Sequence, residues 1–484
     1  MPSRAPSHSV LAVAIGVSLV LGGCYHSWRK PDASVPVPGR FREAGPVTDA
    51  RAPQTREFVR AFGSPELDRL VDKALDRNLD IEAAAGRILQ ADAQARIASA
   101  SLWPIGLLNT GVGAARFPRG TAADGSVLSA ASQPKILTLG LSASYEIDFW
   151  GKNRDGVTAA DLQANASRFA RDVVAISTIS AVMNTYFQVL SAQDRLRIVQ
   201  EHNKISSDLL DAIGRKLGSG FATKLDYAQQ KTVWANQRAL IPALEQTIRQ
   251  GKIQLAVLVG ETPESLRIAG GSLARLRIPA VAPGLPSEVL LRRPDISDAE
   301  SRLVSQEFSV SQARASMFPS VQLTGQFGLH NIVLRNALRP EAIGWEILAS
   351  LAQPILDGGR LRGQVDLQEG IYHEQAANYR KQILGALADV ENALISTDET
   401  SRQYRLQGDT AAEARQAFAA ARERLNGGAI DVVSLATNEA ALFQSEDALQ
   451  QARFQLFQSA LALFRALGGG WSPKLGKTAL ASVD

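Results

Sequence analysis

The chain has 484 residues, of which 45% are hydrophobic and 21% are charged. This composition is that of a folded chain with enough length for several domains, and it excludes a disordered or low-complexity protein. The net charge of +4 is too small to indicate a nucleic-acid-binding protein, and the sequence has no run of Lys or Arg that would support that function.

The first 24 residues have the pattern of a secretory signal that ends in a lipidation site. Arg4 precedes the apolar run VLAVAIGVSLVL, which is too short to span a bilayer as a helix. The segment LGGC resembles the bacterial lipobox, in which the cysteine is acylated, and Cys24 is the only cysteine of the chain. We therefore expect a signal peptide at 1–23, a lipidated Cys24 that anchors the protein in outer-membrane lipid, and an extended Pro-rich tether over 24–56. The alternative is a free or cleaved cysteine in a soluble periplasmic protein.

The sequence contains the same order of elements twice. The segment LDIEAAAGRILQADAQARIASASLWP (79–104) matches PDISDAESRLVSQEFSVSQARASMFP (294–319). Each copy reads as helix, strand, strand, long helix, turn and helix, and the long helices are expected at about 154–217 and 360–425. At 1.5 Å per residue each of them reaches about 95–100 Å. The predicted divisions are a first repeat at 57–263, an equatorial linker at 264–293, a second repeat at 294–471 and a C-terminal tail at 472–484.

Four segments alternate apolar and polar residues, as strands do that have one apolar face and one polar face toward water, here called the wet face. We expect these strands at about 106–117, 136–149, 320–330 and 342–353. Strands of about 10 residues fit a β-barrel that crosses a membrane, but four strands cannot close a barrel, because the smallest known have about eight. A trimer would supply twelve strands around a lumen, whereas a dimer would supply eight and fill its interior. The alternative is a soluble sandwich beside a helical stalk.

Glycines mark both ends of each long helix, where the backbone must turn sharply. The residues predicted to form the hinges between strand and helix are Trp150, Gly151, Gly358 and Gly359. The glycines predicted to turn the helices at their far ends are Gly218, Gly220, Gly427 and Gly428.

Several segments together resemble the outer-membrane factor family, the TolC-like channels. YEIDFWGK, LRRPDI (291–296), ASMFPS (315–320) and LDGGR (356–360) come in the order of that family, and with the lipobox they are similar to its NodT-type lipoprotein branch of drug and metal efflux. The resemblance implies a mainly α fold with membrane β-structure. The resemblance also implies a homotrimer, in which a twelve-stranded β-barrel in the outer membrane continues into a long α-helical barrel across the periplasm. It also implies a passive duct that meets a periplasmic adaptor protein and an inner-membrane pump of the resistance-nodulation-division type.

The resemblance further implies that the segments after the tip turns line the periplasmic aperture and contact the adaptor. In many relatives an apolar residue and, four positions later, an Asp form constriction rings. Here these positions are Val433 and Thr437, so the apolar ring is kept but the acidic ring is in doubt. Asp226 or Asp431 could supply nearby charge, or both could be solvated carboxylates at helix ends. The residues assigned to the aperture and adaptor contact are Asp226, Gln229, Asp431, Val433 and Thr437.

The sequence contains no motif of a catalytic or metal-binding site. None of the five histidines pairs at metal-ligand spacing, and G-x-S-x-G, P-loop and H-E-x-x-H motifs are absent. We therefore expect no enzyme activity, no cofactor, no metal and no nucleic-acid partner. Two alternatives to an efflux duct stay open, namely a duct for type I protein secretion and a non-conducting structural lipoprotein. The latter should lack the wet strand faces.

Overall fold

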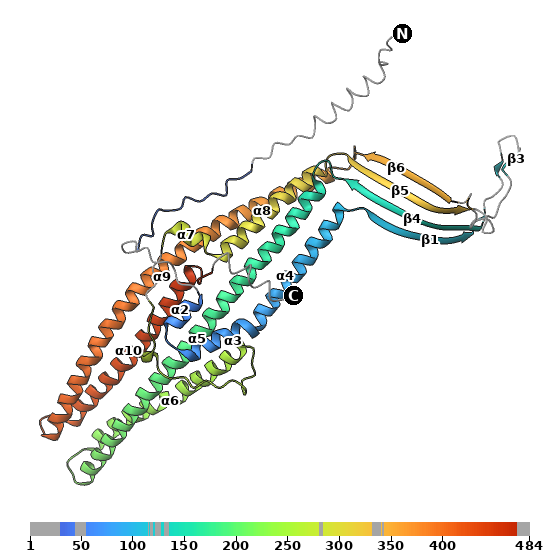
Figure 1. Cartoon of the computed structure of the whole chain (residues 1–484). Helices are drawn as coiled ribbons and strands as arrows, with labels where there is room; N and C mark the ends of the chain where they lie inside the picture. The colour runs from blue at the N-terminus through green and yellow to red at the C-terminus, as the bar shows by residue number, and fades with distance from the viewer. Residues whose placement is uncertain are drawn as a thin grey trace. The chain divides into compact units, whose positions relative to one another are not determined.

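The computed structural model describes residues 30–43, 55–114, 116, 120–121, 127–129, 135–279, 284–331, 340 and 343–471 (Figure 1). These residues are mostly helical, with one four-stranded and one two-stranded sheet. Contacts divide the chain into two units. One holds the described residues within Met1–Ala33, Gln90–Asn165 and Ser301–Asn378, and the other holds those within Ser34–Leu89, Ala166–Glu300 and Tyr379–Asp484.

Two helical hairpins of identical length dominate the described chain. Helix α5 (Lys152–Gly218) and helix α9 (Arg360–Asn426) have 67 residues each. Their return helices, α6 (Lys224–Leu258) and α10 (Val432–Ala466), have 35 residues each. These equal lengths agree with the repeat in the sequence and with the predicted long helices to within two residues. The remaining helices are α2 (Thr55–Ala61), α3 (Pro65–Arg77), α4 (Leu79–Ser99), η1 (Ala100–Leu102), η2 (Leu273–Arg275), α7 (Pro286–Leu291) and α8 (Pro294–Ala315).

The four predicted strands form one antiparallel sheet in the order β1-β4-β5-β6, drawn as four curved arrows in Figure 1. Its register continues each face from strand to strand, because Leu141 lies opposite Phe327, which lies opposite Trp345. Strands β1 and β6 are the two edges of this sheet. The strand bounds are β1 (Ile105–Ala114), β4 (Lys135–Ile147), β5 (Ser320–Asn331) and β6 (Ile343–Ala352).

The structure corrects the end of one predicted strand. Strand β4 stops at Ile147 instead of 149, because the N–H of Phe149 turns back to the carbonyl of Ile147 at 3.0 Å. Strand β1 stops at Ala114, and the predicted end at 117 lies outside the described residues. A short hairpin of β2 (Gly120–Thr121) and β3 (Val127–Ser129), which the sequence analysis did not predict, lies in the loop between β1 and β4.

The main hydrophobic core contains a group of aromatic side chains from α2, from the residue that follows α2, and from α5 and α10. The rings of Phe58 and Phe464 stack with centroids 3.7 Å apart, and Phe62 lies 5.1 Å from Phe187. All four side chains are buried. Among the described helices, only α5 is long and apolar enough, by length and composition, to cross a membrane. Because 56% of its most apolar window is buried within this chain, we assign that window to the core.

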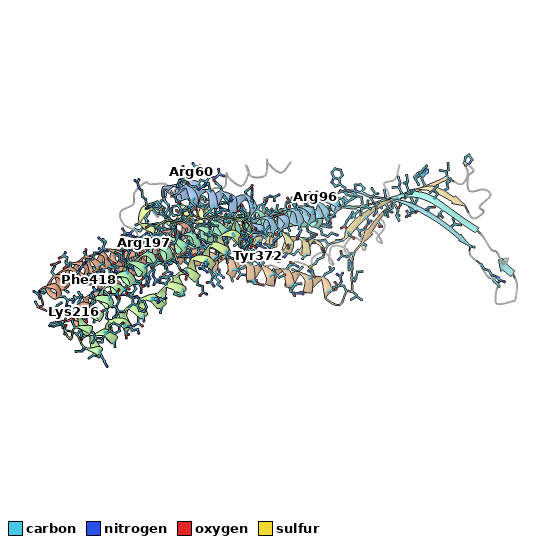
Figure 2. All side chains as sticks on the ribbon, turned by 90° about the horizontal axis from the view of Figure 1, so that it is seen from below. Arg60, Arg96, Arg197, Lys216, Tyr372 and Phe418 are labelled. Carbon is cyan, nitrogen blue, oxygen red and sulfur yellow. The ribbon has the colours of Figure 1, made fainter. Side chains whose placement is uncertain are left out.

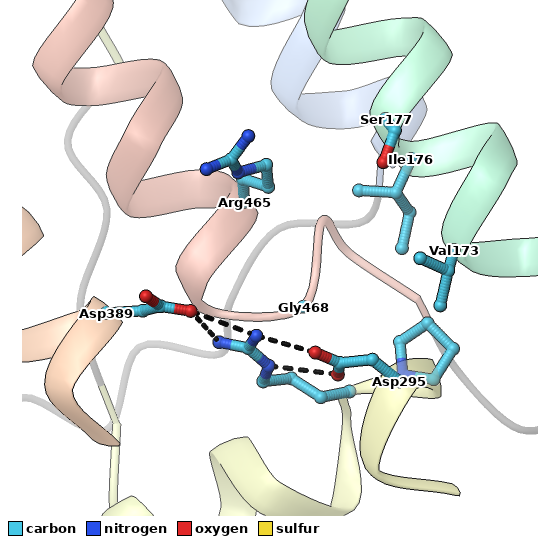
Figure 3. A pocket seen from close by; sticks show the side chains of 9 residues that line it. Val173, Ile176, Ser177, Asp295, Asp389, Arg465 and Gly468 are labelled. Carbon is cyan, nitrogen blue, oxygen red and sulfur yellow. Dashed lines mark hydrogen bonds and ion pairs between the residues drawn. The ribbon is translucent and has the colours of Figure 1, made fainter. Parts of the chain in front are cut away.

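A buried arginine joins the start of α8 to α9 and α10 (Figure 3). The Arg293 guanidinium, in a residue 8% exposed, donates to Asp295 at 2.7 and 3.1 Å and to Asp389 at 3.1 Å. It also donates to the carbonyl of Ala466 at 3.1 Å. Burial alone would raise the pKa of Asp295, but hydrogen bonds from Arg293 and from Gln382 outweigh it and lower that pKa. We call this group the Arg293 clasp.

Removing the Arg293 charge should destabilise the fold. The substitution Arg293→Met keeps side-chain length but leaves Asp295 without its cation, and we expect a cost of about 3 kcal/mol. This is the low end for a buried pair, because the Asp389 side chain is 57% exposed. The measurement is the midpoint of thermal unfolding in detergent. Arg465→Met is the control, since Arg465 lines a pocket together with Arg293, Asp295 and Asp389 but is exposed. Equal losses in the two variants would contradict the assignment.

Candidate functional site

The first hairpin turns at a glycine in the left-handed region. Gly220 has a φ of 80°, the N–H of Phe221 donates to the carbonyl of Lys216 at 2.8 Å, and the N–H of Gly220 donates to Leu217 at 3.1 Å. This pattern is the Schellman motif that ends many helices. Gly218, the last residue of α5, has no positive φ and has open space around it, so only Gly220 requires glycine.

The second hairpin turns in the same way. Gly428 has a φ of 71°, and the N–H of Ala429 donates to the carbonyl of Arg424 at 2.8 Å. Gly427 has no positive φ. The two tips therefore have the same backbone conformation, in which the second glycine of each predicted pair takes the left-handed conformation.

The two predicted aperture carboxylates, Asp226 and Asp431, cap the helices that leave the tips. Asp226 forms a capping box with Thr223, in which its N–H donates to the Thr223 hydroxyl at 3.1 Å and its carboxylate accepts the Thr223 N–H at 2.8 Å. Asp431 is the N-cap of α10 and accepts the N–H of Ser434 at 2.8 Å. Hydrogen bonds from Ser434 hold the pKa of the Asp431 carboxyl below its usual range.

The other three predicted aperture residues lie together in one groove between α6 and α10. Gln229 comes from α6, and Val433 and Thr437 come from the first turns of α10. The groove has a volume of ≈ 570 Å³, and its other lining residues are mostly small and apolar. The Thr437 hydroxyl donates to the carbonyl of Val433 at 2.9 Å, so its polar atom is turned back onto its own helix. A second groove, between α5, α9 and α10, is lined by Lys216 and Phe418, which Figure 2 labels.

All three predicted hinge glycines have a positive φ, which is 81° at Gly151, 66° at Gly358 and 84° at Gly359. In the second hinge the Asp357 carboxylate accepts the N–H groups of Gly359 and Leu361 at 2.9 Å each, and these bonds lower the pKa of Asp357.

The first hinge is fixed by an aromatic pair and by two ion pairs. The Trp150 ring stacks on Phe318 at 4.8 Å, and its indole N–H donates to the carbonyl of Pro319 at 2.8 Å. The two ion pairs at the end of β4 and the start of α5 are Glu146 with Lys152 and Asp148 with Arg154.

A buried polar group that the sequence did not predict lies near the tips. The Glu439 side chain on α10 is fully buried, and its carboxylate accepts from the Ser206 hydroxyl of α5 and from Gln230 at 3.3 Å and Gln237 at 3.5 Å of α6. All three partners are neutral. Glu439 therefore ties both helices of the first hairpin to α10.

The connection between α5 and α10 continues away from the tip. His202 contacts Glu446 at 2.8 Å, and Arg415 of α9 donates to the other oxygen of Glu446 at 2.6 Å. Arg195 forms a bidentate ion pair with Asp447, with hydrogen bonds of 2.6 and 3.1 Å. Glu439 and Glu446 lie one heptad apart, as do Arg195 and His202, which is the only sequence signal of this contact. We call these contacts the polar seam.

Cys24 lies outside the described residues, so its predicted lipidation stays a prediction. Within the described part of the chain, no group of three or more His, Cys, Asp or Glu side chains could hold a metal ion.

Residues 70–261 and 285–469 match the family model described as outer membrane efflux protein. The chain belongs to this family. The pyoverdine export outer membrane protein OpmQ of Pseudomonas aeruginosa is 34% identical over 460 residues, which cover 94% of this chain and 96% of OpmQ. The probable outer membrane lipoprotein SilC of Salmonella typhimurium is 27% identical over 465 residues, which cover 95% of this chain and 98% of SilC. The outer-membrane channel OprN has the same fold, with a TM-score of 0.85, at 24% identity over 93% of this chain and 99% of that one.

This membership confirms the family and the fold class predicted from the sequence. The protein is an outer-membrane component of an efflux system. The family and these relatives are channel proteins rather than enzymes.

The polar seam should make the stability of the folded state depend on pH in the acidic range. Hydrogen bonds from His202 and Arg415 lower the pKa of Glu446 from its ordinary value of 4.5. The folded state therefore favours the ionised carboxyl. The resulting stabilisation is fully present above pH 4.5 and is lost as the pH falls through the lowered pKa.

We expect the thermal midpoint of Glu446→Gln to fall less steeply below that pH than the midpoint of the natural chain. Glu245→Gln is the control, because Glu245 forms only an exposed pair with Arg249 at 3.5 Å and should leave the acid slope unchanged. Identical slopes in all three proteins would show that Glu446 does not contribute.

Proposed function

We propose that the chain works as a homotrimer that forms the passive exit duct of a tripartite efflux system. The observation that carries this proposal is the four-stranded sheet with two free edges, β1 and β6. Each edge strand has 10 residues, which matches one crossing of a bilayer. In hydrocarbon every unpaired backbone group costs several kcal/mol, so the edges must pair with further copies of the chain.

The number of copies follows from the two faces of the sheet. One face carries exposed apolar side chains such as Leu141, Phe327 and Trp345, which suit lipid. The other face carries polar side chains such as Ser142 and Gln326, which need water. Twelve strands leave a wet bore for this face, whereas eight strands leave space only for the side chains themselves.

The proposed trimer is tested by the mass of the protein in detergent. Light scattering corrected for bound detergent should give three times the mass of one mature chain. Since the edges cannot stay open in lipid, the natural chain should show no monomer at micromolar concentration. A stable monomer or dimer that inserts into bilayers would contradict the proposal.

The partners are proposed from the tips and from the relatives. We propose that the grooves and turns at the tips contact a periplasmic adaptor, and that an inner-membrane pump of the resistance-nodulation-division type supplies the energy. OpmQ is named for pyoverdine export, and SilC is named as a probable lipoprotein. These names support small molecules as the cargo and acylation at Cys24 as the anchor. The groove residues Gln229, Val433 and Thr437 are proposed to line the aperture, with Asp226 and Asp431 beside them.

Widening the proposed aperture should raise its conductance. Val433 is 40% exposed in the groove, and Val433→Gly removes its side chain at three symmetric positions of the trimer. We expect single-channel conductance in planar bilayers to rise at least about twofold, because an apolar constriction limits ion flow.

The matched control for this experiment is Val432→Gly. It makes the same substitution one residue earlier in α10, at a position that does not line the groove. A similar rise in both variants, or no rise in Val433→Gly, would remove Val433 from the constriction.

A further inference from the structure

The wet face of the sheet can be followed residue by residue through its register. Ser142 of β4 lies opposite Gln326 of β5, which lies opposite Glu346 of β6. One row nearer to the helices, Ser144 lies opposite Thr324. The Asn109 amide donates to the Ser142 hydroxyl at 2.8 Å, so β1 shares this face. Hydroxyl and amide groups therefore provide most of its polarity.

Only two wet-face positions with described side chains are charged, and both are glutamates. Glu146, at the end of β4, contacts the ammonium of Lys152 at 2.5 Å, and this ion pair offsets its charge. Glu346 is exposed, and no described side chain forms a hydrogen bond or an ion pair with it. Its register neighbours Gln326 and Ser142 are neutral. Glu346 is thus the one uncompensated charge on this part of the sheet.

In the proposed trimer, strand β1 of the next copy offers no cation to this charge. Strand β6 is an edge, so in the proposed trimer it pairs with β1 of the next copy. The sequence of β1, IGLLNTGVGA, contains no charged residue. No register of that pairing can therefore place a cation of β1 against Glu346.

The proposed aperture offers no comparable acidic ring. Val433 and Thr437 are uncharged, and the carboxylates of Asp226 and Asp431 accept backbone N–H groups at helix N-termini. The positive end of the helix dipole partly offsets such carboxylates.

We infer that Glu346 determines the ion selectivity of the duct. This inference rests on the proposed trimer, whose threefold symmetry places three Glu346 carboxylates at one height of the barrel. Rings of Asp or Glu side chains make pores prefer cations, because they raise the local cation concentration in the bore. The preferred cargo form is then neutral or cationic, and anionic molecules meet a barrier at this ring.

The test is the reversal potential of the full-length natural trimer in planar bilayers under a KCl gradient. The natural channel should prefer K⁺ over Cl⁻ by at least about threefold, and Glu346→Gln should lower this ratio to about one. Glu346→Asp keeps the charge and should keep the preference. Gln326→Glu adds a carboxylate on the neighbouring strand in the same row and should increase it.

The control is Glu245→Gln, which neutralises an exposed carboxylate of α6 outside the sheet and the proposed aperture and should leave the reversal potential unchanged. The tip variants Asp226→Asn and Asp431→Asn test the competing site. Conducting channels in which Glu346→Gln leaves the selectivity unaltered would overturn this inference but keep the duct. A shift caused by the tip variants instead would overturn it in the same way. A natural protein that forms no channels at all would overturn the proposed duct itself.

Discussion

Two unpaired sheet edges constrain everything else in this molecule. On its outer side, each of the strands β1 and β6 presents a row of backbone N–H and C=O groups that no other strand of the described chain pairs. A water-soluble protein can leave such an edge in solvent, but a lipid-embedded sheet cannot. In the proposed homotrimer, identical copies of the chain complete the sheet, and the face that carries Ser142 and Gln326 then surrounds the bore. Closing the sheet into a barrel therefore requires a polar face toward the water-filled bore, whether or not that face also contacts cargo.

The long hairpins meet a related difficulty, because a helix of 67 residues cannot wrap around a compact core. The aromatic core reaches only part of α5, and nearer to the tips polar contacts take over. Ser206, His202 and Arg195 of α5 each contact an acidic residue of α10. Burying Glu439 among neutral partners costs desolvation energy that a hydrophobic residue would avoid. Glu439 instead fixes the alignment of α10 along α5 and α6, because sliding one helix along the other would leave this carboxylate without its hydrogen bonds.

The sequence predicted the elements well and their tertiary contacts poorly. The lengths of α5 and α9 and the faces of β4 and β5 follow from hydrophobic periodicity and from glycine positions, which are local signals. The contact of Ser206 with Glu439 joins residues separated by 233 positions, and no local pattern reveals it. The β2–β3 hairpin was missed because its paired segments are too short to alternate visibly. Of each tip pair, the sequence could not tell that Gly220 and Gly428, rather than Gly218 and Gly427, take the left-handed conformation, since only the hydrogen bonds of the turn decide it.

The uncharged residues Val433 and Thr437 of the proposed constriction and the charged Glu346 of the barrel wall meet different electrostatic requirements. A constriction that closes brings its residues from three copies together, and three carboxylates in that position would repel one another most strongly when the aperture is shut. Val433 and the inward-bonded Thr437 avoid this repulsion and can pack against their symmetry mates. A barrel has a fixed bore, so charges on its wall never have to approach each other. Placing the selective carboxylate at Glu346 therefore separates selection from gating, and each can then change without disturbing the other.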